Sequence, residues 1–214
     1  MANYCTFAQI QASDPDGGLY SSTDAKYEAA ITAMLPQASR LIDKEVGRWD
    51  NYFSPTTDDE TRYFDGAGSD IELHIDEMVS LTSVSVAEEG GTSSSDYTDW
   101  TEDTDFFVWP YNHTAQGSPI RGLVVDLNGS KLSWTKYRKA VKVTGVFGYS
   151  ATVPEDVNRA CQIQVMRWYM RAKQGYQDAG AGGDFGQLIY AQSLDPDVRE
   201  ILKHYKVWTT ATYP

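Results

Sequence analysis

One junction between a strand and a helix constrains this chain more than any other stretch of it. Residues 141–149, VKVTGVFGY, alternate apolar positions up to two glycines, and with a local adjustment at Gly145 these positions line one face of a strand. Pro154 then opens a helix, since a first helical position has no N–H bond to lose. Carboxylates follow at residues 155–156, near the positive end of the helix dipole. The junction predicts a β segment that leads directly into a helix.

Two long amphipathic helices are expected, one on each side of the β segment. The first begins after Thr23 and Asp24, which can cap it, and its apolar side chains keep helical spacing as far as Gly47. Pro36 interrupts this pattern without shifting its phase, so we expect a kink or two short helices. The second runs from Pro154 to about residue 174, with an apolar stripe of Val157, Cys161, Val165, Trp168 and Ala172.

A short C-terminal helix follows a glycine-rich connection at residues 175–186. Asp195 is its expected N-cap and Pro196 its first residue. Its apolar side chains recur at helical spacing as far as Tyr205, near which we expect the helix to end.

Between the long helices the period of the pattern changes to two. Strands are expected at residues 62–66, around 71–75, 79–86, 106–109, 123–127 and 140–147, with loops at 90–95 and 112–119. Short strands separated by turn signals indicate an antiparallel sheet or a small sandwich.

These patterns together predict an α+β protein, in which a small helical body carries an inserted antiparallel β domain. The expected division is an irregular N-terminal segment at 1–22, a helical body at 23–60 and 148–205, a β domain at 61–147 and a C-terminal tail at 206–214.

The net charge of −12 is concentrated in the middle of the chain. Residues 49–140 hold seventeen acidic and six basic side chains, and the stretch from Glu88 to Asp105 holds seven acids and no base. Such a surface repels the phosphate backbone, so tight binding of duplex DNA is not expected. A role in solubility alone fits the same charge.

Membrane segments and disulfides are not predicted. No run of about 18 apolar residues exists, and the N-terminus lacks the pattern of a signal peptide. Cys5 and Cys161 are too few and too far apart in sequence to indicate a disulfide framework, so a reducing cytoplasm is the simplest setting.

No motif predicts an enzyme, a cofactor or a metal. His74, His113 and His204 are widely separated, and no pair has the spacing of a zinc site. Cys161 lies on the apolar stripe of its helix, which favours a core position over a reactive one. The chain contains neither a G-x-S-x-G elbow nor a phosphate-binding G-x-x-x-x-G-K loop. A hydrolase that uses a pair of the many acids remains an alternative, but no pair is singled out.

Aromatic residues crowd the β segment, and three interpretations are open. The residues are Trp100, Phe106, Phe107, Trp109, Tyr111 and Trp134. Rings stack on the apolar faces of sugars, which would suit a carbohydrate-binding module, and they also dominate protein interfaces. Core and cross-strand pairs of a sheet are the third interpretation.

Several short motifs, in their order along the chain, resemble the head–tail adaptor (connector) family of tailed phages, in its long form with a β insertion. The resemblance covers about residues 20–206, apart from 85–135. The motifs are ASRLID at 38–43 with Gly47-Arg48, RYFDG at 62–66, IEL at 71–73, LTSV at 81–84, VTGVFGY at 143–149, VPEDV at 153–157 and the helix at 194–205.

The resemblance implies a structural role with no catalytic residues. Members of the family form a dodecameric ring below the portal protein, extend the DNA channel and dock head-closure or tail-completion proteins. This implies a homo-oligomer in the neck of the virion, made in the host cytoplasm, through which DNA passes without tight binding. Another virion component, in tail completion or the baseplate, is the nearest alternative.

The C-terminal tail is the expected portal-binding segment. It is rich in residues that favour strands and too short to form a sheet alone, so it could gain hydrogen bonds at a partner's sheet edge. In adaptors that this chain resembles, the C-terminal segment anchors the ring to the portal. The expected docking residues are Val207, Trp208, Thr210 and Tyr213, with Trp208 and Tyr213 as aromatic anchors. A merely frayed terminus is the competing interpretation.

Overall fold

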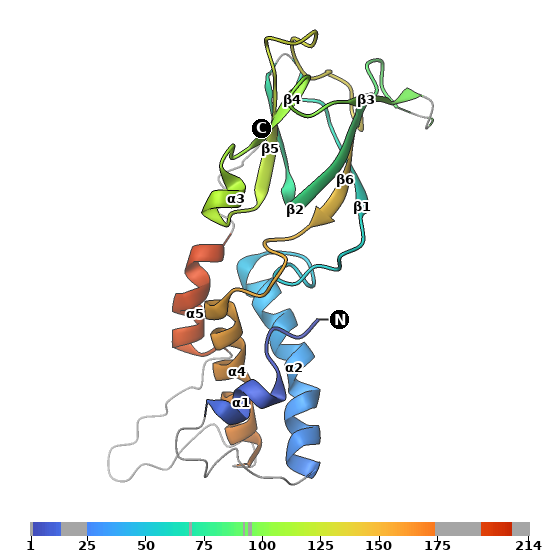
Figure 1. Cartoon of the computed structure of the whole chain (residues 1–214). Coiled ribbons are helices and arrows are strands. Elements are labelled where there is room, and N and C mark those ends of the chain that lie inside the picture. The colour runs from blue at the N-terminus through green and yellow to red at the C-terminus, as the bar shows by residue number, and fades with distance from the viewer. Residues whose placement is uncertain are drawn as a thin grey trace, which may run out of the picture. The chain divides into compact units, whose positions relative to one another are not determined.

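The computed structural model describes residues 2–13, 25–68, 70–91, 93, 96–173 and 194–206. The chain divides into two units (Figure 1). The helical unit consists of Met1–Asn51 with Val153–Pro214, and the sheet unit consists of Tyr52–Thr152. Helices and an antiparallel sheet are both present, which confirms the α+β class.

The two long helices of the helical unit are α2, Ala25–Val46, and α4, Glu155–Lys173, which pack on each other (Figure 1). Pro36 lies inside α2, which is one continuous helix, so the alternative of two short helices is wrong. The apolar stripe keeps its phase across the proline and is buried on both sides of it, at Ile31 and Leu35 before and at Ala38 and Ile42 after. This packing outweighs the loss of one hydrogen bond.

The junction at the start of α4 forms much as the pattern predicts. Pro154 directly precedes the helix, and its carbonyl accepts a hydrogen bond from the Asn158 N–H at 2.9 Å. Val157, Cys161 and Val165 of the predicted stripe are fully buried.

Two shorter helices complete the helical unit. The N-terminal segment was expected to be irregular, but residues Phe7–Ala12 form α1. Its start is a capping box, in which Thr6 and Gln9 satisfy each other's backbone N–H groups at 3.2 and 2.8 Å. The C-terminal helix α5, Pro196–Leu202, has the predicted Asp195 cap and continues as a 3₁₀ turn at Lys203–Tyr205.

The strands of the sheet unit form one antiparallel sheet of six strands. They are β1, Glu60–Phe64; β2, Glu72–Val86; β3, Thr98–Trp100; β4, Phe106–Trp109; β5, Ile120–Val125; and β6, Val141–Phe147. The order is β1-β6-β2-β5-β4, with β3 also paired to β2, so β1 and β4 are the edges of that path (Figure 1). The described strands thus belong to a single sheet rather than a sandwich.

Strand β2 is the organising element of the sheet, because it pairs with β3, β5 and β6 along its fifteen residues. Strand β6 keeps a regular alternation through Gly145, with Val141, Val143, Gly145 and Phe147 all on the buried face. The expected adjustment therefore lies in β2 instead, where the register with β6 shifts twice between Met78 and Ser83.

The segment at 112–119, expected to be a loop, contains the short helix α3, His113–Gln116. Gly117 ends this helix in the left-handed conformation, with φ of 60°. Among the residues that the structure describes, no helix combines the length and apolar character needed to cross a membrane.

Candidate assembly surfaces

The four predicted portal-docking residues, Val207, Trp208, Thr210 and Tyr213, lie outside the described residues. The last described residue, Lys206, is held on the helical unit because its Nζ contacts Glu45 Oε1 at 2.6 Å. Three surface features of the described residues remain as candidate sites of assembly.

The six aromatic residues that the sequence analysis singled out divide between the core and the surface of the sheet unit. Trp100 and Trp134 are buried and stacked, with ring centroids 4.8 Å apart. The indole N–H of Trp134 donates to the Ile71 carbonyl at 3.0 Å, which fixes a residue outside the strands against the sheet. Phe106 is also buried. The core interpretation therefore holds for three of the six residues.

The other three lie at or just after edge strand β4, and we call them the aromatic face: Phe107, which is half-buried, and Trp109 and Tyr111, which are exposed. Trp109 is 42% exposed and Tyr111 63% exposed. Residues two apart in a strand share a face, so Phe107 and Trp109 point away from the core that Phe106 and Val108 enter.

The geometry around the aromatic face keeps it open and apolar. Trp109 pairs with Gly122 of β5, and a Cβ on that glycine would lie 4.0 Å from the Trp109 ring, which places the indole over bare backbone. Tyr111 meets the Phe107 ring edge-on, with centroids 6.3 Å apart. An edge strand with exposed aromatic side chains is suited to association with another protein surface.

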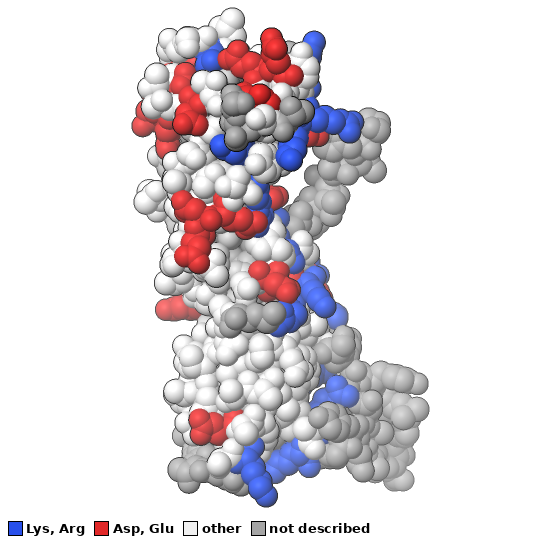
Figure 2. Space-filling view, turned by 90° about the vertical axis from the view of Figure 1, so that its right-hand side faces the viewer, with Lys and Arg blue, Asp and Glu red and all other residues white. Residues whose placement is uncertain are grey.

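The second feature is an acidic pocket of about 420 Å³ between the end of β2 and the start of β3. Its lining includes Glu88, Glu89, Gly90, Asp96 and Thr98. Glu88 is paired with Lys131 at 2.8 Å. Figure 2 shows acidic side chains gathered over the sheet unit on the face in view. This surface suits a basic partner and disfavours nucleic acid.

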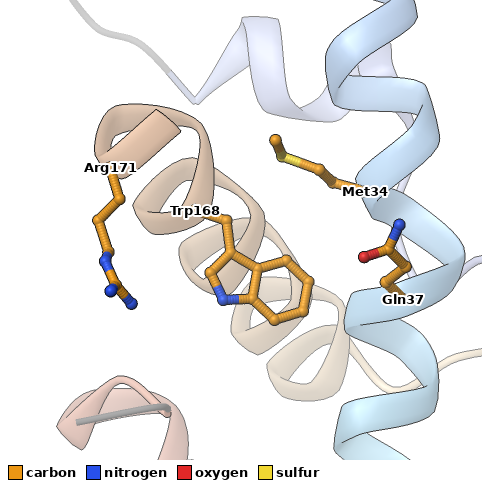
Figure 3. Close-up of a pocket in the computed structure, with 4 residues that line it drawn as sticks. All are labelled: Met34, Gln37, Trp168 and Arg171. Atoms are coloured by element: carbon orange, nitrogen blue, oxygen red, sulfur yellow. The ribbon is translucent and has the colours of Figure 1, made fainter. Parts of the chain in front are cut away.

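The third feature is a groove of about 250 Å³ between α2 and α4. Met34 and Gln37 line it from α2, and Trp168 and Arg171 line it from α4. In Figure 3 the Trp168 indole points toward α2, and the Met34 side chain projects toward α4. The sequence places Trp168 on the apolar stripe of α4. In the structure its indole lies toward α2 and closes part of the space between the two helices.

The histidines do not come together. His74 and His204 are exposed and His113 is half-buried. In the part of the chain that the structure describes, no three His, Cys, Asp or Glu side chains are grouped so that they could hold a metal ion.

Sequence reasoning missed a polar network that joins the N-terminal segment to α2. Ser39 and Asp43 are buried, although both are polar and lie on the apolar stripe. The Tyr4 backbone N–H donates to Ser39 Oγ at 2.9 Å, and the Tyr4 hydroxyl donates to Asp43. The other Asp43 oxygen accepts from the Asn51 N–H at 2.9 Å. Both residues belong to the ASRLID motif. They are four residues apart, about one helical turn, and this spacing is the sequence signal from which the network could have been predicted.

Comparison with known proteins finds similarity at the level of structure. No family model matches the sequence, and no curated protein matches it. A chain in the structure of the virion of a native gene transfer agent (GTA) particle matches with a TM-score of 0.52 and 14% identity, covering 96% of this chain and 91% of that chain. The two chains therefore share a fold.

Two further chains come from structures of GTA particle necks. One, from the neck of an empty particle computed with C6 symmetry, has a TM-score of 0.45 and 12% identity, with 96% and 91% of the two chains covered. The other, from the neck of a native particle computed with C12 symmetry, has a TM-score of 0.47 and 11% identity, with 96% and 93% covered.

Proposed function

We propose that this chain is a structural virion protein, a head–tail adaptor whose copies form a ring below the portal, extend the DNA channel and dock head-closure or tail-completion proteins. The observation that carries the proposal is the fold shared, over 96% of the chain, with a chain of a GTA virion particle. The adaptor-like motifs support it, since they occur in family order at the elements that build this fold.

The surfaces of the sheet unit supply a physical basis for such a ring. A closed ring needs a head-to-tail contact, in which one patch of each subunit meets a different patch of the next. The aromatic face is an exposed apolar patch at a sheet edge, and the acidic pocket lies elsewhere on the same unit. We assign the aromatic face to the contact between neighbouring subunits.

Electron cryo-microscopy of intact particles tests the proposal directly. The expected density for this chain is a ring between the portal and the tail, twelve-membered if the resemblance holds. Density in the baseplate or elsewhere in the tail would favour the alternative of another virion component. Density in the shell or in fibres would overturn the adaptor assignment.

Assembly in solution tests the assigned contact. We expect the free chain to be monomeric or weakly associated and to form rings when purified portal is added. Trp109→Ser should abolish ring formation while leaving the monomer folded. Leu132→Ser is the matched control, because Leu132 is 75% exposed and lies outside the aromatic face. Equal assembly by both variants would remove the aromatic face from the contact.

Carbohydrate binding is a second candidate, favoured by the exposed side chains of Trp109, at the end of edge strand β4, and of Tyr111, two residues later. A glycan array with the wild-type chain and with Trp109→Ala separates the two roles. Glycan binding that disappears in the variant would support the module. Trp100→Ala is unsuitable for this test, because Trp100 is buried against Trp134.

A further inference from the structure

Two cysteines that are far apart in sequence meet inside the helical unit. Cys5 lies just before α1 and Cys161 lies in α4, and both are fully buried. Their Sγ atoms are 3.1 Å apart. Because a disulfide bond is about 2.05 Å long, the sulfurs need to approach by only about 1 Å to bond.

We propose that Cys5 and Cys161 are a site of reversible oxidation, at which a disulfide locks residues 2–13 onto α4. The two cysteines are free thiols in this structure. In the oxidised form, a covalent bond would join two segments that are now held together by hydrogen bonds and packing.

The polar contacts on both sides of Cys5 hold the two sulfurs in register. The Tyr4 N–H donates to Ser39 Oγ at 2.9 Å, and the Tyr4 carbonyl accepts from Asn158 Nδ2 at 2.7 Å. Asn158 also donates to Gln9 Oε1 at 3.1 Å, four residues beyond Cys5. Since Asn158 lies one turn before Cys161 in α4, these contacts fix the approach of the N-terminal segment to the same turns of the helix.

The surroundings distinguish the two thiols chemically. The Cys5 thiol donates a hydrogen bond to the Cys161 sulfur, which lowers the pKa of Cys161 against the effect of its burial, and Ser39 contributes in the same direction from 4.0 Å. The same hydrogen bond, together with burial, raises the pKa of Cys5. With the N-terminal segment in place, the thiolate is therefore favoured on Cys161 over Cys5.

The reaction requires a small disulfide such as oxidised glutathione. In the opened segment, the thiolate of either cysteine attacks one sulfur of the reagent, forming a mixed disulfide and releasing one glutathione thiolate. When the segment closes again, the sulfur of the other cysteine loses its proton, attacks the protein sulfur of the mixed disulfide and releases the second glutathione. In balance, two protein thiols and one glutathione disulfide give one protein disulfide and two glutathione thiols, so two electrons pass to the reagent.

The reagent can reach the pair when the N-terminal segment lifts. Asn3, Thr6, Ala8 and Gln9 around Cys5 are exposed, and α1 has only six residues, so this segment is a peripheral element whose local opening uncovers both sulfurs. Once the disulfide has formed, the same segment cannot detach without reduction.

Thiol counting on the purified full chain tests the proposal. The reduced chain and the chain treated with oxidised glutathione are unfolded, alkylated with N-ethylmaleimide and weighed by mass spectrometry. The reduced chain should take up two labels and the oxidised chain none, and a peptide map should link Cys5 to Cys161. Cys5→Ser and Cys161→Ser are matched controls, each of which should fail to form an internal disulfide.

Hydrogen exchange shows whether the bond locks the segment. The amides of residues 6–13 should exchange about tenfold more slowly in the oxidised than in the reduced chain.

For thiol counting, oxidation is run in buffer and again in urea below the unfolding transition, so that access of the reagent to the cysteines does not limit the result. Two labels retained under both conditions, or glutathione adducts and chain dimers in place of the internal link, would overturn the proposal.

Discussion

Replacing Gly145 by alanine should destabilise the sheet unit, although the new methyl group is small and β6 stays regular through this position. A Cβ at Gly145 would lie 2.2 Å from the Ser80 carbonyl oxygen and 2.7 Å from Met78 Cε. Both atoms belong to β2, the strand on which the sheet is organised. The Met78 side chain can rotate its terminal methyl group away, but the Ser80 carbonyl is part of the backbone and can move only if β2 moves.

The size of the effect follows from these distances. Ordinary contact begins at 3.4 Å, so the atoms at 2.2 Å must separate by about 1.2 Å. Overpacking of this kind costs about 1–3 kcal/mol, and a strained or lost ladder hydrogen bond costs about 1 kcal/mol more. Alanine restricts the unfolded chain more than glycine does, which offsets about 0.5–1 kcal/mol of this loss of stability. The net loss is about 2 kcal/mol, or roughly 10 °C in the unfolding midpoint of a unit of about 100 residues.

Gly117→Ala is the matched control. Gly117 has φ of 60° and no atom within 4 Å of the position that a methyl group would take, so alanine there meets backbone strain without a steric clash. That strain costs about 1 kcal/mol. Urea unfolding followed by hydrogen exchange at β2 and β6 compares the two variants. A loss at Gly145 no larger than at Gly117 would refute the close approach of β2 and β6 at this point.

Three further predictions concern the helical unit, the tail and DNA. Asp43→Ala should lower the free energy of unfolding of the helical unit by about 2–4 kcal/mol, because the Tyr4 hydroxyl and the Asn51 N–H lose a buried acceptor. Thermal unfolding followed by circular dichroism measures this loss, and a loss below about 0.5 kcal/mol would contradict the prediction. Deleting residues 207–214 should leave the unfolding temperature nearly unchanged while abolishing portal attachment, and normal attachment in a pull-down would exclude the tail as the anchor. Duplex DNA should show no binding tighter than about 1 μM by fluorescence anisotropy at physiological salt, and a salt-dependent affinity above that limit would contradict the effect assigned to the acidic surface.

Local patterns were enough to place most of the elements. Strand β6 and helix α4 were both predicted from the junction at residues 141–157, because alternation, two glycines and Pro154 each act on their near neighbours. The Asp195 cap of α5 was predicted for the same reason. The ends of the strands were less well predicted, since pairing with a neighbour decides where a strand stops.

Long-range pairing was beyond the reach of these patterns. The alternation at residues 71–75 does not continue in one phase along β2 to residue 86, because the register with β6 shifts between Met78 and Ser83, and the patterns did not predict these shifts. The partition of the aromatic residues depends on the same pairing. Trp134 lies outside the described strands, and its place in the core follows from its burial and from its stacking on Trp100, which are long-range contacts.

Polar residues on the apolar stripe of a helix can be interpreted only when their hydrogen-bond partners are known. Ser39 and Asp43 lie four residues apart in α2 and are 4% and 1% exposed, positions where an apolar side chain would be expected. A buried carboxylate is costly unless it accepts hydrogen bonds, so their presence requires donors from another segment. Tyr4 supplies those donors with its backbone N–H and its hydroxyl. The docking of the N-terminal segment is therefore encoded in α2 as well as in the segment itself, and this docking is also what brings Cys5 to Cys161.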